Sequence, residues 1–449
     1  MRGLVALCAL LIAAPATAHV RLEGSTPAAG AIVHEPLAEL RIVFSAAVEA
    51  RYTGLVLYAP SGAVVPLDSL RADAASRGRA FYVGAPRLPE PGEYRVEWRT
   101  AGADGHVITG SFTFVADPGA VTPAAARDTA AAPAPAPADP GIHEHHAAGP
   151  PEGVFAAQSP LHVLVRALQF ALLLALIGAF ALGRLLLREA TLASHRAGLA
   201  RRLRRYTVLV LTGFLLLLPV RLWLQSGALH GPGSALDPYL VGSMLTELTW
   251  GRAWLAQLVL AGTAALTFAT PLLPIAELAV AALAFTPAFL GHAAGAVDWR
   301  ALTAGAHGVH VLAVGLWIGT LTALFSAGLP ALRSGDEHDL GRAASAVGRF
   351  SPLALGAAAA AVGAGVLMAW LHVGTPDRMA STAYGRTLAL KLALLTLVFV
   401  TGFLNWRRAG SRPAAQLDLP ALRRRIAFEL AAAAAVVLVT AVLVAQPTP

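Results

Sequence analysis

Hydrophobic and polar residues follow different patterns in the two parts of the chain. In residues 19–117, short runs of β-type residues alternate with turn residues such as Pro60-Ser61-Gly62. From residue 160 onward, long apolar runs are separated by short loops. The first pattern predicts a β-sandwich or small barrel. The second predicts helices that cross a bilayer, each of which needs about 20 apolar residues.

These patterns predict five strands and about eight transmembrane helices. The strands are expected at 40–44, 55–58, 80–83, 94–98 and 111–115. The helices are expected at 161–187, 206–227, 249–270, 272–292, 303–328, 349–372, 386–405 and 425–445. The boundary between the third and fourth helices rests on Thr270-Pro271. The predicted fold class is therefore a β domain followed by a membrane all-α domain.

The ends of the β region predict two further segments. Residues 1–18 resemble a signal peptide, with Arg2, an apolar core and the cleavage pattern Ala16-Thr17-Ala18. Cleavage there removes the only cysteine, Cys8, and makes His19 the first residue of the mature chain. Residues 118–158 form an Ala/Pro-rich linker with a histidine cluster at 143–146. The expected domains are thus 1–18, 19–117, 118–158 and 159–449.

The charge distribution predicts membrane topology. The chain is 56% hydrophobic and 13% charged, with a net charge of +8. Its arginines gather in alternate loops, 184–205, 329–349 and 407–425, which should face the cytoplasm. An even number of spans then places both the β domain and the C-terminus outside. This pattern predicts a multi-pass protein of the bacterial cytoplasmic membrane with a periplasmic N-terminal domain, and it disfavours nucleic acid as a partner.

Most of the 14 histidines fall on the predicted outer side. Imidazole suits copper and zinc, whereas a thioether selects Cu(I). A mature His19 offers its amine and its imidazole, and Asp104 and His106 are spaced to share one face of a strand. Together they are a candidate Cu(II) site. The alternative is that Asp104-Gly105 is a plain turn and His106 an ordinary strand residue.

A set of motifs in the β region resembles the CopC family of periplasmic copper carriers. The motifs are His19-x-x-Leu22-x-x-Ser25-x-Pro27-x-x-Gly30, Val43-Phe44-Ser45, Gly92-x-Tyr94-x-Val96-x-Trp98, Asp104-Gly105-His106 and Gly110-x-Phe112-x-Phe114. The resemblance implies a Greek-key, Ig-like β-sandwich or barrel and a Cu(II) site at His19, Asp104 and His106. Some members have a glutamate where this chain has Ala46, and some have a methionine-rich Cu(I) site, which this domain lacks.

The helical half resembles CopD, the membrane partner of CopC. The matching stretches are Gly291-His292-Ala293, His310 to Gly319, Arg349-Phe350-Ser351 and Tyr384-Gly385-x-x-Leu388-x-x-Lys391. The run from His310 to Gly319 is the most specific of these. The whole chain is therefore identified as similar to fusions of the two families, which implies a role in copper resistance or uptake.

Five residues near the outer helix ends are candidates for a membrane site where copper enters. His307 and His310 share a helix face, as do Met368 and His372, and His292 ends the preceding helix. The thioether would favour Cu(I). The alternative for His307 and His372 is that they merely lie at the membrane interface. In the linker, His143, His145 and His146 are candidates for weak copper capture.

Deeper in the spans, Lys391 is expected to pair with another charge, because a buried charge needs a partner. No phosphate-binding loop is present, which argues against ATP as the energy source.

We therefore predict a non-enzymatic protein that binds copper outside the cytoplasmic membrane and transports it across, with import favoured. Its predicted partners are the copper ion and the bilayer, with a periplasmic copper chaperone as a further candidate. Two alternatives remain open. One is a membrane redox protein with haem or copper held by the outer histidines. The other is a copper-sensing adaptor.

Overall fold

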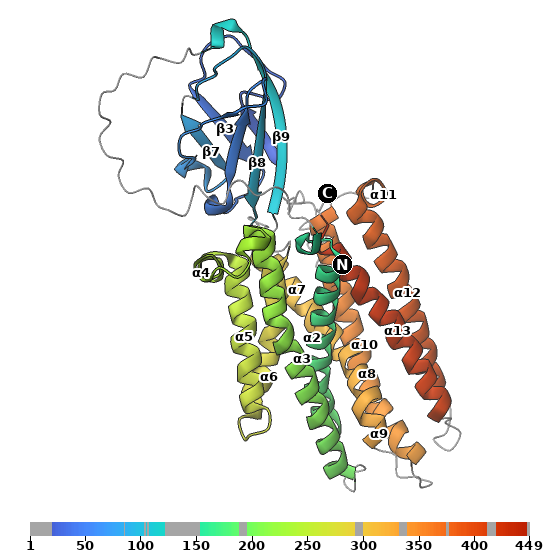
Figure 1. Cartoon of the computed structure of the whole chain (residues 1–449). Coiled ribbons are helices and arrows are strands. Elements are labelled where there is room, and N and C mark those ends of the chain that lie inside the picture. The colour runs from blue at the N-terminus through green and yellow to red at the C-terminus, as the bar shows by residue number, and fades with distance from the viewer. Residues whose placement is uncertain are drawn as a thin grey trace.

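The computed structural model describes most of the chain. The described residues are 20–84, 86–102, 105, 107–121, 153–187, 195–291, 300–331, 339–373, 377–410 and 419–446. Side chains are not described at 300, 339–344, 372–373, 377–378, 405–406, 408–410 and 419. Within these limits the chain forms a β domain that stands on one end of a helical bundle (Figure 1).

The β domain is a sandwich of two sheets. One sheet has the order β1-β3-β7-β6 and the other β2-β9-β8-β4-β5. The strands are β1 (Leu22–Thr26), β2 (Ile32–Val33), β3 (Glu39–Phe44), β4 (Gly54–Tyr58), β5 (Val64–Val65), β6 (Arg71–Ala72), β7 (Ala80–Gly84), β8 (Gly92–Ala101) and β9 (Val107–Ala116). All five predicted strands are confirmed. Sequence patterning missed β2, β5 and β6, because a strand of two residues has no readable alternation, and it missed β1, in which no residue is fully buried and Gly24 and Ser25 interrupt the pattern.

Alternation along the strands builds the sandwich core. In β3, Leu40, Ile42 and Phe44 are fully buried while the residues between them are partly exposed. Phe44 meets the ring of Trp98 edge-on, with ring centroids 5.3 Å apart. Such a core buries one face of each sheet against the other, as in other β-sandwiches.

The bundle is built from long apolar helices. Its helices are α2 (Pro160–Leu186), α3 (Arg196–His230), α4 (Pro238–Glu247), α5 (Thr249–Thr267), α6 (Leu273–Leu283), α7 (Arg300–Val314), α8 (Thr320–Ala323), α9 (Leu329–Ala331), α10 (Asp339–Val373), α11 (Asp377–Ser381), α12 (Ala383–Gly410) and α13 (Leu419–Leu443). Two π-helical turns, Gly315–Gly319 and Leu324–Gly328, make α7, α8 and α9 one continuous rod.

The eight predicted helices are all present, with one adjustment. Seven described segments are long and apolar enough to cross a membrane. The helix α5 is not among them, because Arg252 and Gln257 lower its hydropathy. The turn at Thr270 separates α5 from α6, as predicted. The α6 helix ends at Leu283, earlier than expected, and a 3-10 turn (Thr286–Leu290) with Pro287 follows it.

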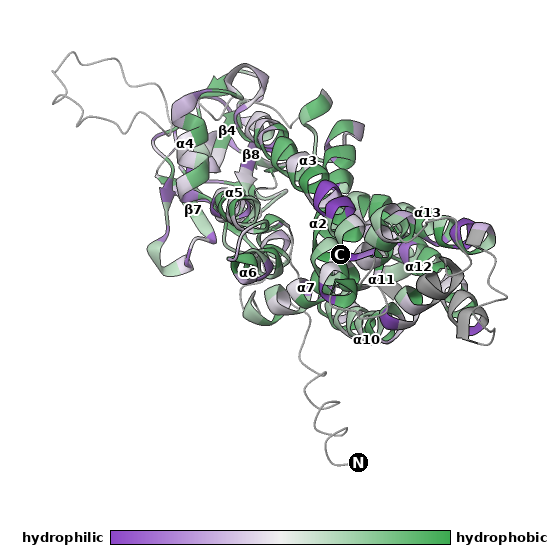
Figure 2. Cartoon of the chain, turned by 90° about the horizontal axis from the view of Figure 1, so that it is seen from below, coloured by the Kyte–Doolittle hydropathy of each residue, from purple (hydrophilic) through white to green (hydrophobic). Residues whose placement is uncertain are grey.

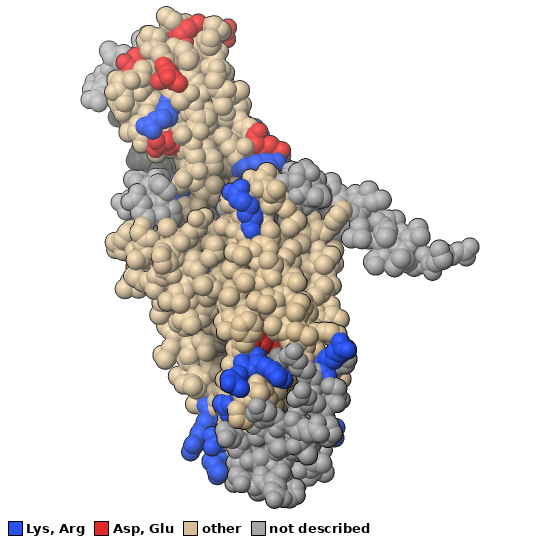
Figure 3. Space-filling view, turned by 90° about the vertical axis from the view of Figure 1, so that its right-hand side faces the viewer, with Lys and Arg blue, Asp and Glu red and all other residues tan. Residues whose placement is uncertain are grey.

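The surface of the bundle matches a lipid environment. Large apolar side chains are exposed on its sides, among them Leu209, Leu216, Leu266, Leu278 and Val366. In Figure 2 the helices carry mostly hydrophobic colours. On the face shown in Figure 3 the middle of the bundle is almost uncharged, and basic side chains gather at the end opposite the β domain, with a few more near the β domain. The β domain and the end of α13 lie on the other side (Figure 1). The exposed apolar surface and the seven candidate spans indicate a multi-pass membrane protein.

Small residues let the π-helical rod pack tightly on α2. The Cβ of any larger residue at Gly178 would lie 1.8 Å from the carbonyl carbon of Gly319. The Cβ of a larger residue at Gly319 would in turn lie 1.8 Å from the carbonyl oxygen of Leu174. Only glycine at both positions allows this backbone approach. The contact places Trp317, on the same π-helical turn, at the centre of the bundle.

Candidate functional site

A cavity of about 220 Å³ lies inside the helical bundle. Its wall is mostly apolar and comes from α2, α3, the turn after α6, α7, α10, α12 and α13. Its lining includes three of the five candidates for the membrane copper site, namely His307, His310 and Met368. Helical spacing had paired His307 with His310, but only the fold brings Met368 to the same cavity.

The ring of His310 is oriented by α10. Its Nδ1 lies 2.8 Å from the carbonyl oxygen of Ala361. A carbonyl can only accept, so Nδ1 carries the proton and Nε2 keeps its lone pair. Gly365 of α10 lies beside the ring, since a Cβ there would stand 3.4 Å from Cε1 of His310, an ordinary van der Waals distance. A carbonyl bonded to the far nitrogen is the usual second-shell arrangement of a metal-binding histidine.

Two aromatic rings line the cavity on its side away from the β domain. Trp317 and Phe399 both line the cavity, and their rings stack with centroids 5.0 Å apart. Trp317 lies seven residues beyond His310, which is about 10 Å further along a helix. The imidazoles and the thioether therefore occupy the part of the cavity nearer the β domain, above this aromatic pair.

The cavity also contains cations, which the sequence had not assigned to it. Arg221 and Lys391 are among its lining residues. Lys391 was expected to pair with another charge, and this is wrong for the part of the chain that is described, where it has no ion pair. The described lining of the cavity has no acidic side chain, and Glu277 lies at the opposite end of the bundle, where it pairs with Arg184.

No described group of three or more His, Cys, Asp or Glu side chains is placed to hold a metal ion. The cavity instead offers two imidazoles and one thioether. This donor set lacks carboxylates, the ligands that hard cations prefer, and resembles the soft sets that select Cu(I). Two more polar residues line the cavity: Tyr384, which belongs to a stretch that resembles CopD, and Thr440, which sequence reasoning missed.

The other predicted site residues lie outside the described structure. These are His19, Asp104 and His106 of the Cu(II) site, His292 of the membrane site, and His143, His145 and His146 of the linker. For His372 only the helical backbone of α10 is described.

Gly105, the middle residue of the Asp104-Gly105-His106 motif, is described and touches the bundle. It has a φ of +74° in the tight turn between β8 and β9. Its carbonyl oxygen accepts a hydrogen bond of 2.7 Å from Gln225 Nε2 on α3. A Cβ on Gly105 would lie 3.3 Å from Trp250 of α5. The tip of this hairpin is therefore seated on the ends of α3 and α5.

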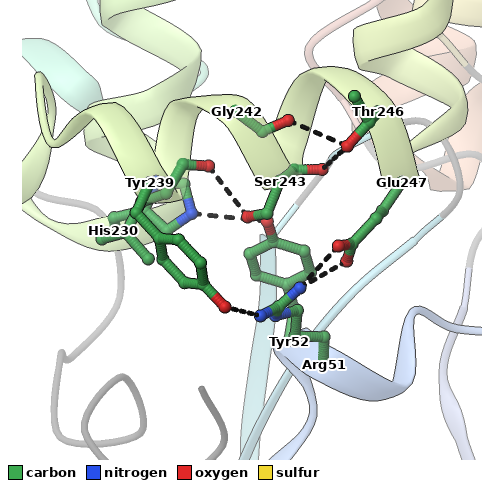
Figure 4. Close-up of polar contacts among 9 residues, drawn as sticks. Arg51, Tyr52, His230, Tyr239, Gly242, Ser243, Thr246 and Glu247 are labelled. Carbon is green, nitrogen blue, oxygen red and sulfur yellow. Dashed lines mark hydrogen bonds and ion pairs between the residues drawn. The ribbon is translucent and has the colours of Figure 1, made fainter. Parts of the chain in front are cut away.

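Polar contacts hold the β domain in this position. Arg51 donates to both carboxylate oxygens of Glu247 on α4 at 2.6 Å and to the hydroxyl of Tyr239 at 2.9 Å (Figure 4). Its hydrogen bond to Glu247 raises the pKa of Arg51. Arg99 donates to the carbonyl oxygens of Ala228 and Leu229, at 3.1 and 2.8 Å. A cation is favourable there because the last turn of α3 carries the negative end of the helix dipole.

Apolar side chains complete the interface. Ala101 of β8 is fully buried in the same hydrophobic cluster as Trp250 and Met244 of the bundle, and Tyr52 and Val107 pack against this cluster. The Trp250 ring in turn lies against Arg221, whose guanidinium carbon is 5.9 Å from its centroid. A continuous set of contacts thus connects Gly105, through Trp250 and Arg221, with the cavity.

Three family models match the chain. The CopC domain matches residues 22–117, the N-terminal domain of copper resistance protein D-like proteins matches 157–302, and copper resistance protein D matches 344–443. The second match covers α2 to α6, and the third covers α10, α12 and α13. The cavity is lined by helices from both.

Curated relatives agree with these matches. Copper transport protein CutJ of Bacillus subtilis (strain 168) is 25% identical over 100% of this chain and 78% of its own length. Copper resistance protein C of Pseudomonas syringae pv. tomato is 35% identical over 23% of this chain and 86% of its own length. Among solved structures, CopC from Methylosinus trichosporium OB3b is 26% identical, with a TM-score of 0.21, and covers 22% of this chain and 94% of that structure.

Proposed function

The chain belongs to the copper resistance family in which a CopC domain is joined to a copper resistance protein D domain, and on this premise we propose that it binds copper outside the cytoplasmic membrane and transports it inward. One observation carries the proposal. The cavity brings His307, His310 and Met368 together within the bundle. The β domain is seated at the end of the bundle nearest these side chains.

The first step of the proposed function is capture of Cu(II) by the β domain. The proposed ligands are the amine and imidazole of His19, which is the first residue after removal of a signal peptide, with Asp104 and His106. The linker histidines 143, 145 and 146 would raise the local copper concentration, because tethered sites act at high effective concentration. A periplasmic chaperone is a second proposed source of copper.

The second step is entry of Cu(I) into the cavity. His310 is suited to this step because its Nε2 lone pair is directed away from the bond to Ala361. Met368 adds the soft donor, and His292 and His372 are further proposed ligands at the outer end. The change of oxidation state requires one electron per copper ion from a donor outside the chain.

Release to the cytoplasm requires the aromatic pair to separate. Trp317 is positioned by a π-helical turn, a feature that is frequent at functional sites. The membrane potential favours the inward direction for a cation, by about 2.3 kcal/mol per 100 mV. In this proposal the chain is a transporter rather than an enzyme, and it contributes to copper homeostasis or resistance.

The test is radioactive copper uptake by cells that carry the wild type, His310→Ala or Thr440→Val. Thr440 lines the same cavity, and its hydroxyl already donates to the carbonyl of Val436, so its replacement is a matched control. We expect His310→Ala to abolish most of the uptake and Thr440→Val to preserve it, at equal protein levels. Equal uptake by all three would overturn the proposed site.

The same preparation separates the alternatives. A redox protein with haem at His310 would show a Soret band in the purified chain, which we do not expect. A copper-sensing adaptor would bind copper but would not move it into proteoliposomes. Loss of the gene should lower cytoplasmic copper if the direction is inward, and raise it if the direction is outward.

A further inference from the structure

Lys391 is the only lysine of the chain, which carries arginine at every other permanently cationic position. It comes from α12 and lines the same cavity as His307, His310 and Met368. It is half-buried within the bundle, and among the described residues its side chain has neither an ion pair nor a hydrogen bond. A buried ammonium without an anion beside it is costly, so its position requires an explanation.

A second cation lines the same cavity. The guanidinium of Arg221, on α3, donates to the side-chain oxygen of Gln169 and lies over the ring of Trp250. The guanidinium of Arg166, on α2, donates to the carbonyl oxygen of Ala441 at 2.8 Å and repels Arg221. All of these partners are neutral, so the positive charge in this part of the bundle is hydrogen-bonded but not balanced.

The described lining of the cavity contains no carboxylate. The titratable side chains that line it are Arg221 from α3, His307 and His310 from α7, and Tyr384 and Lys391 from α12. The turn after α6 and the helices α2, α10 and α13 contribute no charged group to the described lining. Loss of a proton could neutralise Lys391 but not Arg221, because a guanidinium keeps its proton in proteins. A bound anion is the remaining way to balance the charge.

We propose that the cavity contains an anion subsite, formed by Lys391 and Arg221, that takes a small monovalent anion such as chloride. A compact ammonium suits a small spherical anion, whereas arginine suits the flat, bidentate carboxylate and phosphate groups. The small volume and largely apolar wall of the cavity also favour an anion that is easily dehydrated. This role rests on the proposed function: in a chain that transports Cu(I), the anion would offset the repulsion between Cu(I) and the cationic side chains of Lys391 and Arg221.

The single lysine allows a direct test of the subsite without copper. Lysine labelled in its side-chain carbon and nitrogen gives one NMR signal in the full chain, held in nanodiscs and purified with a tag that lacks lysine. Chloride is titrated against gluconate at constant ionic strength. We expect a saturable shift of an ammonium signal. A signal that does not respond to chloride, or that belongs to a neutral amine, would overturn the subsite.

Charge variants provide the second test. Broadening of the chlorine NMR line measures chloride binding by the wild type, Lys391→Met and Lys391→Arg, with Thr440→Val as the control in the same cavity. Loss of a charged hydrogen-bond donor should weaken chloride binding about tenfold or more in Lys391→Met. Lys391→Arg should retain binding, which also shows that the fold tolerates change at this position. Wild-type binding by Lys391→Met would contradict the proposal.

Copper uptake then connects the subsite with the proposed function. Proteoliposomes that contain wild type should take up Cu(I) faster in chloride than in gluconate, and Lys391→Met should lose this difference. If chloride binds as expected but no variant transports copper, the anion subsite stands and the transport proposal fails. If copper is transported equally in both salts, the proposed role of the anion in copper binding is wrong.

Discussion

The β domain and the helical bundle offer copper different ligands. The donor set proposed for the β domain is an amine, two imidazoles and a carboxylate, from His19, Asp104 and His106. The bundle places two imidazoles and a thioether, from His307, His310 and Met368, around one cavity. Nitrogen and oxygen donors in a tetragonal arrangement favour Cu(II), whereas a thioether favours Cu(I). The two regions are therefore suited to different oxidation states of the same metal.

The two sets of ligands are also positioned differently. In the β domain, two of the proposed ligands are the sequence neighbours of Gly105, which lies between β8 and β9. In the bundle, the imidazoles come from α7, the thioether from α10 and the cations from α3 and α12. A hairpin can present ligands by local geometry alone, but the cavity exists only when several helices pack together. Substitutions should therefore act on the two sites independently.

The largest expected effect is on Cu(II) affinity, and it distinguishes the proposed site in the β domain from the cavity in the bundle. His106→Ala should weaken Cu(II) binding by the full chain about 100-fold or more, since loss of even an outer-shell partner costs 10- to 100-fold. His310→Ala should leave Cu(II) affinity unchanged. Competition titration and the Cu(II) EPR spectrum measure both, with His34→Ala as a control, because His34 is exposed and paired with Asp117. A comparable loss in His310→Ala would mean that Cu(II) also binds in the bundle.

A smaller effect tests the preference of the cavity for Cu(I). Met368→Leu keeps most of the volume of the side chain and removes only the sulfur. We expect Cu(I) affinity to fall about tenfold, corresponding to about 1.4 kcal/mol, while Cu(II) affinity is unchanged. Titration with a Cu(I)-selective chelator measures the change, and Met379→Leu is the control because Met379 is not among the cavity residues. An equal loss in both variants would exclude Met368 as a specific ligand.

The two regions also differ in how much of them the sequence predicts. Strand patterning placed five of the nine described strands, and hydropathy placed the eight predicted helices, because these patterns repeat along the chain. Patterning did not reveal the π-helical turn at Gly315–Gly319, which arises from the close approach of Gly319 to α2. It also missed α4, which is too short and too polar to stand out as a span.

The cavity shows the same limit of sequence reasoning. Spacing along one helix predicts that His307 and His310 share a face. The position of Met368 at the outer end of its helix made it a candidate for the same site, but the sequence does not predict that Arg221 and Lys391 line this cavity, because they meet it only through packing. The expectation that Lys391 has a charged partner followed from a correct general rule about buried charges, but the rule does not say whether the partner is a side chain or a bound ion.

The smallest expected effect concerns the contact between the two regions. Arg51→Ala and Glu247→Gln each remove the ion pair that links the β domain with α4. The pair is partly exposed, and such pairs contribute about 0.2–1 kcal/mol, so copper uptake at limiting copper should slow by no more than about fivefold. Cu(II) affinity should not change, because the pair lies outside both proposed copper sites.

A double-mutant cycle sharpens this prediction. If the ion pair acts only by docking the β domain, the effect of Arg51→Ala combined with Glu247→Gln should be close to that of either single change. At saturating copper, all three variants should approach the wild-type rate, since capture then no longer limits uptake. Additive effects would indicate separate roles for the two residues. A defect that persists at saturating copper would mean that docking of the β domain alters the bundle itself, through Trp250 and Arg221, and not only the supply of copper.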